Sequence, residues 1–307
     1  MTQQSQLDIP GSSLAQTLEG QWGGRLIQSV GDPDGTLVID VVGPHFVPGF
    51  ASQSVPVLST TDIAGLSLSG AGQNVDIDLV PSGTALSAQP STLFYVYIEY
   101  ALSANPSLVA SLVAPTLVDG IYLLNNTGQG IKAFFLGWIR MDSGGRFVNT
   151  DAARCVVNYY NRRPTRIRLR PAYSDNNANT TFSLNTATWA RANGGTGDTA
   201  EYIANGEDAI HVHAQYTLGA VAPAAVIQVG IGDNSNTQPS SAAAMGSAAI
   251  SGSSAACSLC VTPAVGYRTL TMLGMTGGLA TTFAADYARN GAAADPSVTS
   301  LYAMIPT

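Results

Sequence analysis

The sequence predicts a mainly β protein: an antiparallel β front domain with one short helix, followed by a C-terminal β-sandwich or jelly-roll-like domain. Short runs rich in β-branched and aromatic residues recur along the chain, and clusters of Gly, Asn, Ser and Pro separate them. Some runs alternate strictly, as 74–80 does with Val75, Ile77 and Leu79 on one face. Helical spacing is scarce, so short strands joined by turns account for most of the chain.

Composition divides the 307 residues into three regions. Residues 1–30 are mostly polar, with one short apolar cluster around Trp22, and predict an N-terminal arm. Residues 31–163 predict a β-rich domain, with strands at 36–42, 57–58, 66–68, 74–80, 92–100, 108–113 and 120–124. Residues 164–307 predict the sandwich domain, with strands at 182–190, 209–218, 225–231, 256–261, 267–273, 281–287 and 300–305.

The two halves meet at a predicted β-hairpin over 135–148. Its apolar run ends at Arg140, and Gly144 and Gly145 lie in a turn where positive φ angles are often needed. The next segment, 151–161, is the least strand-like of the region and is expected to form the short helix. Three large side chains of this half are expected in the core: Tyr97, Phe135 and Trp138.

The chain has few charged residues, and its acidic residues outnumber its basic ones. Charged residues make up 11% of the chain, against about 25% in typical domains, and the formal net charge is −7. These values argue against a nucleic-acid binder. No apolar run reaches 18 residues and no secretory signal is visible, so we expect a soluble protein made in a cytoplasm, without membrane insertion.

Five of the thirteen basic residues fall in the nine positions 162–170. A nucleic-acid surface would need a larger basic field with interleaved aromatic residues. From Arg166 onward, arginines alternate with inward-facing Ile167 and Leu169. We therefore expect the arginines to pair with carboxylates at a domain or subunit interface, where the planar guanidinium suits buried partners. They are Arg162, Arg163, Arg166, Arg168 and Arg170.

Histidines and cysteines give the only candidate metal ligands. His211 and His213 are two residues apart, so a strand would present both on one face. Three copies around a threefold axis would gather six imidazoles, enough for a six-coordinate metal such as iron. An ordinary pair on a strand face is the simpler interpretation, and no other cofactor is expected. Cys257 and Cys260 form a CxxC within a strand-like run, so we expect buried thiols there and at Cys155.

No catalytic or nucleotide-binding motif is present, and we expect no enzymatic activity. A glycan hydrolase would need two facing carboxylates. The sequence around the four glutamates does not identify any of them as catalytic: Glu19, Glu99, Glu201 and Glu207. Asp76 and Asp78 share one face of a predicted strand and are expected to be solvated.

Three segments resemble a family of virion proteins of tailed bacteriophages and prophages. They are 95–100 (YVYIEY), 135–149 (FLGWIRMDSGGRFVN) and 152–163 (AARCVVNYYNRR). In that family an aromatic strand precedes a G-x-x-R hairpin and a segment ending in Asn-Arg-Arg, and a β-rich C-terminal domain follows. Residues 228–236 and 266–270 fit more loosely, so the resemblance covers about 75–305 and omits the first 70 residues.

The resemblance implies a non-enzymatic component of the virion surface, with 31–163 as an attachment domain. It implies a homotrimer, a short tail fibre or spike, that contacts other virion proteins and a host surface glycan. A capsid decoration protein is the first alternative. A carbohydrate-binding module or a glycan hydrolase is the second, and such a module would use exposed aromatic residues: Trp189, Tyr202 and Tyr287.

Overall fold

The structure is a computed structural model. It describes residues 25–28, 38–42, 45–47, 57–59, 67–69, 91–99, 107–118, 121–125, 132–143, 147–160, 162–169, 181–192, 199–221, 226–245, 254–284 and 299–307. All regular secondary structure in these ranges is β, which confirms the mainly β prediction. No helix in the same ranges is suited to crossing a membrane.

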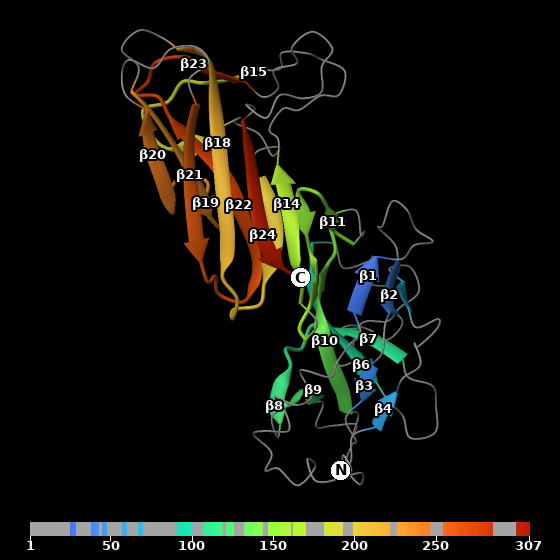
Figure 1. The fold of residues 1–307 in the computed structure, drawn as a ribbon. Helices are drawn as coiled ribbons and strands as arrows, with labels where there is room; N and C mark the ends of the chain where they lie inside the picture. Colours follow the sequence, from blue (N-terminus) through green and yellow to red (C-terminus); the bar gives the residue numbers. More distant parts are fainter. Residues whose placement is uncertain are drawn as a thin grey trace, which may run out of the picture. The chain divides into compact units, whose positions relative to one another are not determined.

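The chain forms two compact units (Figure 1). The first comprises residues 1–149, 155–163 and 307, and the second comprises 150–154 and 164–306. The sequence places the domain boundary between 163 and 164, where the long segment of the second unit begins. Most of the expected arm, 1–30, lies outside the described residues, as do the strand expected at 74–80 and the turn glycines Gly144 and Gly145.

The first unit contains the strands β1 (Arg25–Gln28), β2 (Val38–Val42), β3 (His45–Val47), β4 (Val57–Ser59), β5 (Ser67–Ser69), β6 (Leu93–Glu99), β7 (Ser107–Ser111), β8 (Thr116–Val118), β9 (Ile121–Asn125), β10 (Lys132–Arg140) and β13 (Val156–Asn158). Its main sheet has the order β7-β6-β10-β9-β8, and β13 also pairs with β10. A smaller sheet has the order β1-β2-β5, and β3 pairs with β4. At the turn of the expected hairpin, Met141 and Phe147 form an isolated antiparallel β-bridge.

A β-bulge in β10 organises the core of this unit. Phe135 lies opposite Tyr97 and Trp138 lies opposite Tyr95, so the register slips by one residue between them. The slip turns Phe135 and Trp138, three positions apart, toward the same face. Their rings meet edge to face with centroids 4.9 Å apart. Phe135, Trp138 and Tyr97 are all buried, as predicted.

The prediction of a helix at 151–161 is wrong. This segment instead forms β12 (Ala153–Arg154) and β13. Residues 155–159 are all buried, so the segment has no polar face for a surface helix to expose. β-Branched Val156 and Val157 suit a strand buried on both sides, and β10 supplies the backbone partner.

The second unit contains β11 (Asn149–Thr150, whose first residue belongs to the first unit), β12, β14 (Pro164–Leu169), β15 (Thr181–Leu184), β16 (Ala190–Arg191), β17 (Thr199–Ala204), β18 (Ile210–Val221), β19 (Ile227–Asp233), β20 (Ser241–Met245), β21 (Ser254–Val261), β22 (Gly266–Met275), β23 (Thr281–Ala284) and β24 (Ser300–Pro306). One sheet has the order β11-β12-β17-β22-β19-β20, with β16 beside β22. The other has the order β14-β24-β18-β23-β15, with β21 beside β18.

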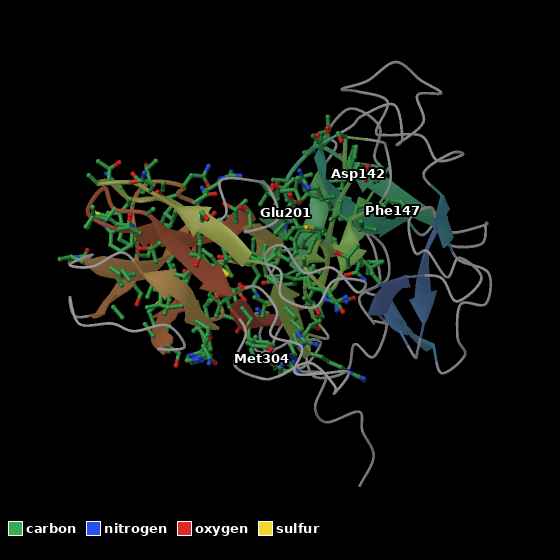
Figure 2. The ribbon with its side chains drawn as sticks, turned by 90° about the horizontal axis from the view of Figure 1, so that it is seen from above. Asp142, Phe147, Glu201 and Met304 are labelled. Carbon is green, nitrogen blue, oxygen red and sulfur yellow. The ribbon has the colours of Figure 1, made fainter. Side chains whose placement is uncertain are left out.

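One hydrophobic core lies between these two sheets, as in a β-sandwich. Ile167, Val212 and Ala303 from one sheet and Val229 and Leu270 from the other belong to a single buried cluster. Tyr216 of β18 also links the sheets by hydrogen bonds. Its hydroxyl donates to the Gly230 carbonyl (2.6 Å) and accepts the Leu273 N–H (3.1 Å). In Figure 2, Met304 of β24 and Glu201 of β17 lie on opposite sides of this unit.

Candidate functional site

The outer face of β14, β24, β18 and β21 carries several residues that the sequence analysis singled out: Arg166, Arg168, His211, His213 and Cys260. These four strands are adjacent in the order β14-β24-β18-β21 (Figure 1). Each alternates an inward apolar residue with an outward one, as in Val212 between exposed His211 and His213. One outer row runs Arg166–Met304–His211–Cys260 across the sheet, and the next runs Arg168–Tyr302–His213–Ser258.

A hollow of about 590 Å³ lies over these rows. Arg166, His211 and His213 supply its titratable nitrogen atoms, and Tyr302, Met304, Ser258 and Cys260 supply the remaining outward side chains. Met304 is 44% exposed and adds a large apolar side chain to the lining. Among the described residues that line it, none carries a carboxylate. The hollow is therefore a partly apolar surface that carries one guanidinium and two imidazoles.

Two arginines of the predicted interface flank the same aromatic ring. The guanidinium carbon of Arg166 lies 4.5 Å from the centroid of Tyr302, and that of Arg168 lies 5.7 Å away. Such cation–π contacts hold a guanidinium over the ring face. No carboxylate of the described residues lies within ion-pair distance of either arginine, so their expected pairing with acids across an interface stays a prediction.

The other predicted interface arginines lie elsewhere. Arg162 is 5.5 Å from the ring centroid of Tyr159 in the first unit. The Arg163 backbone exchanges two hydrogen bonds with Thr307, at 2.8 and 2.9 Å. Arg170 lies outside the described residues. The arginine run therefore divides at Pro164, and among its described members only Arg166 lines the hollow.

The histidine pair lies on the outer face of its strand, as its spacing predicts. His213 Nδ1 is 3.0 Å from Ser258 Oγ on β21. The Ser258 carbonyl in turn accepts a hydrogen bond from Ser241 Oγ of β20 (2.6 Å). Within the described ranges, no group of three His, Cys, Asp or Glu side chains is placed to hold a metal ion. A site completed by further copies of the chain stays a prediction.

The CxxC does not bring two thiols together. A spacing of three on a strand sends Cys257 inward and Cys260 outward. Burial raises the pKa of the Cys257 thiol to about 11, which disfavours the thiolate needed for redox chemistry or metal binding. Cys155 is buried as expected, whereas the expected burial of Cys260 is wrong because its side chain is exposed.

Of the aromatic residues proposed as a sugar platform, Tyr202 is not available for one. Tyr202 is fully buried, and its hydroxyl donates to Asp233 (3.2 Å). Burial raises the pKa of Tyr202, and the Asp233 carboxylate raises it further. Trp189 packs near Gly230, where an added Cβ would come within 3.3 Å of its ring. Tyr287 lies outside the described residues.

Asp233 also pairs with Arg268, whose guanidinium lies 2.8 Å from the carboxylate. Burial alone would lower the pKa of Arg268, but the hydrogen bond and charge of Asp233 outweigh it and raise that pKa. The Asp233 carboxylate accepts hydrogen bonds from both the Arg268 guanidinium and the Tyr202 hydroxyl. They stabilise a cross-strand arrangement of β17, β19 and β22.

The acids considered for glycan hydrolysis acquire no shared cleft among the described residues. Glu19, Asp76 and Asp78 lie outside the described ranges, and only the backbone of Glu99 is placed. Glu201 is half-buried on β17, where its N–H donates to the Ala152 carbonyl (3.0 Å). Glu207 is exposed in the turn held by Asn205. Neither Glu201 nor Glu207 lines the hollow.

Sequence reasoning missed Tyr302, Met304 and Ser258 as members of the site. The available signal was the alternation in the last strand, where Leu301, Ala303 and Ile305 are buried and the residues between them face outward. No protein-family model matches the chain, and no curated protein is significantly similar to it in sequence. The candidate site is therefore defined by the geometry of this chain alone.

Proposed function

We propose that this chain is a non-enzymatic structural protein on the surface of a tailed-phage virion. In this proposal it is a homotrimeric short appendage, a tail fibre or spike, whose β-sandwich contacts the host surface. Capsid decoration is the alternative position for the same protein.

The observation that carries the proposal is the spatial relation of the three segments that resemble virion proteins. The aromatic segment 95–100 supplies much of β6, the hairpin segment supplies β10, and 152–163 supplies β13. β10 pairs with both β6 and β13. Segments distant in sequence thus form one three-stranded core, which supports a common structural element rather than scattered chance similarity.

Gly137 gives that core a specific physical requirement. A Cβ at this position would lie 2.0 Å from the Val157 carbonyl oxygen, far inside van der Waals contact. The glycine of the G-x-x-R pattern is thus the residue that allows β13 to approach the bulged β10. Gly137 of this motif therefore has a structural role, which suits a family of structural proteins.

The second unit suits a contact role. Its hollow places Arg, Tyr, Met and His side chains on one open face, and Tyr, Met and Arg are enriched where proteins meet partners. The alternative of a carbohydrate-binding module loses the predicted Tyr202 platform, because that ring is buried. The hydrolase alternative finds no carboxylate among the described residues that line this hollow.

Light scattering of the purified full chain tests the assembly. The proposal predicts a native mass three times that of the 31.6 kDa chain. A monomer at micromolar concentration would contradict the free homotrimer. Incubation with bacterial surface polysaccharides, followed by assay of new reducing ends, tests the expected lack of enzymatic activity. Release of sugar fragments would overturn the non-enzymatic assignment.

A further inference from the structure

We propose that the hollow over β14, β24, β18 and β21 binds an acidic polysaccharide through its carboxylate or sulfate groups. This inference rests on the host contact of the proposed function and names the class of ligand at that contact. It depends only on side chains of the second unit, so it can be tested on the purified protein.

Charge segregation is the first argument. The whole chain has 20 acidic and 13 basic residues, yet the described residues that line the hollow include Arg166, two histidines and no carboxylate. Arg168 lies in the neighbouring row, on the same strand as Arg166. A cationic patch on an acidic protein attracts anions locally while the remaining surface repels them. The favoured occupant is therefore an anion.

Arg166, which is exposed and lines the hollow, is placed to bind a ligand rather than to neutralise an internal acid. Its guanidinium carbon lies 4.5 Å from the ring centroid of Tyr302, and that of Arg168, whose Nε is buried, lies 5.7 Å from the same centroid. A guanidinium that stacks through its face keeps its in-plane N–H donors for hydrogen bonds at its edge. Carboxylates and sulfates accept such donors in pairs, which gives both strength and orientation.

The rest of the hollow favours a sugar ring over a small inorganic anion. Tyr302 and the 44% exposed Met304 provide apolar surface, on which the C–H face of a pyranose can lie. His213 Nδ1 and Ser258 Oγ, which are 3.0 Å apart, provide polar atoms that can form hydrogen bonds with sugar hydroxyls. The volume of about 590 Å³ falls within the range of about 300–1,000 Å³ typical of ligand sites. A bare anion would leave most of this space unused.

Isothermal titration of the full chain at low ionic strength tests the proposal with three probes. The first is an oligogalacturonate, the second is its fully methyl-esterified form, and the third is dextran sulfate. We expect binding of at least one polyanion and at least tenfold weaker binding of the ester, which has the same sugar rings without charge. Oligogalacturonate binding assigns a carboxylate ligand, and binding of dextran sulfate alone assigns a sulfate ligand.

Two substitutions place the binding site. Arg166→Gln is expected to weaken binding at least tenfold, because the exposed side chain contributes to the hollow without supporting the core. Arg191→Gln is the matched control: it removes the same charge from β16, in the opposite sheet, and is expected to leave affinity unchanged. Circular dichroism checks that both variants are folded.

Three results would overturn the inference: no binding of either polyanion, measurable binding of the oligogalacturonate that its ester equals, or equal loss of affinity in the two variants. The outcome is separable from the virion proposal. Polyanion binding by a protein that no virion carries would reject the virion role alone. A virion protein with an inert hollow would reject only the ligand assignment.

Discussion

Replacement of Tyr216 by Phe removes the hydroxyl that links the two sheets of the second unit. The ring keeps its place and its edge contact with Phe283, at a centroid distance of 6.1 Å. Two buried backbone groups lose a partner: the Gly230 carbonyl and the Leu273 N–H. Each buried group left unpaired costs about 1–3 kcal/mol. The free energy of unfolding of this unit should therefore fall by about 2–6 kcal/mol, a large part of the ordinary stability of a domain.

Urea denaturation followed by circular dichroism measures the loss, and amide hydrogen exchange at Leu273 gives a local reading. Tyr302→Phe is the matched control, because it makes the same change on the outer face of the same sandwich. We expect it to shift the unfolding free energy by less than about 0.5 kcal/mol. Equal unfolding midpoints for the two variants, or unchanged exchange at Leu273, would refute the sheet-linking role of the hydroxyl.

Three further predictions concern backbone approach, a buried amide and a buried thiol. Gly137→Ala should lower the free energy of unfolding of the first unit by about 3 kcal/mol or more, because its Cβ would meet the Val157 carbonyl at 2.0 Å; near-native thermal unfolding would contradict this. Asn158→Ala should cost about 2–5 kcal/mol in urea denaturation, since its side chain satisfies both the N–H and the carbonyl of Leu26 (2.6 and 3.2 Å). Burial raises the pKa of the Cys257 thiol from 9.0 to about 11, so the contribution of this thiol to stability is complete below pH 9 and is lost as the pH rises to about 11. The free energy of unfolding of Cys257→Ala should therefore decline less steeply with pH in that window than that of the unsubstituted protein. Identical pH profiles of the unfolding free energy would count against a buried thiol.

The fold was predictable where local composition and tertiary pairing agree. The aromatic run 93–99 and the alternating run 300–306 form strands close to the predicted bounds. The helix prediction at 151–161 failed because a weak local pattern was outweighed by pairing with β10. β20, with the sequence SAAAM, was missed because small residues carry no strand signal and its pairing with β19 is long-range information.

The candidate site was predictable in parts but not as a whole. Spacing placed His211 and His213 on one face, and the alternation after Arg166 placed the arginines outward. Their proximity depends on β24 lying between β14 and β18, a pairing between segments more than 80 residues apart in sequence. No periodicity encodes that order. Tyr302 entered the site only through the same pairing.

Immunogold electron microscopy tests the central claim most directly. Antibodies raised against the full chain would be applied to intact particles of the phage or induced prophage whose genome encodes it. The proposal predicts gold at the tail tip, in a pattern that purified protein abolishes by competition. Gold spread over the capsid would contradict the tail position in favour of decoration. Particles that carry no label, and no peptide of the chain by mass spectrometry, would contradict the virion assignment itself.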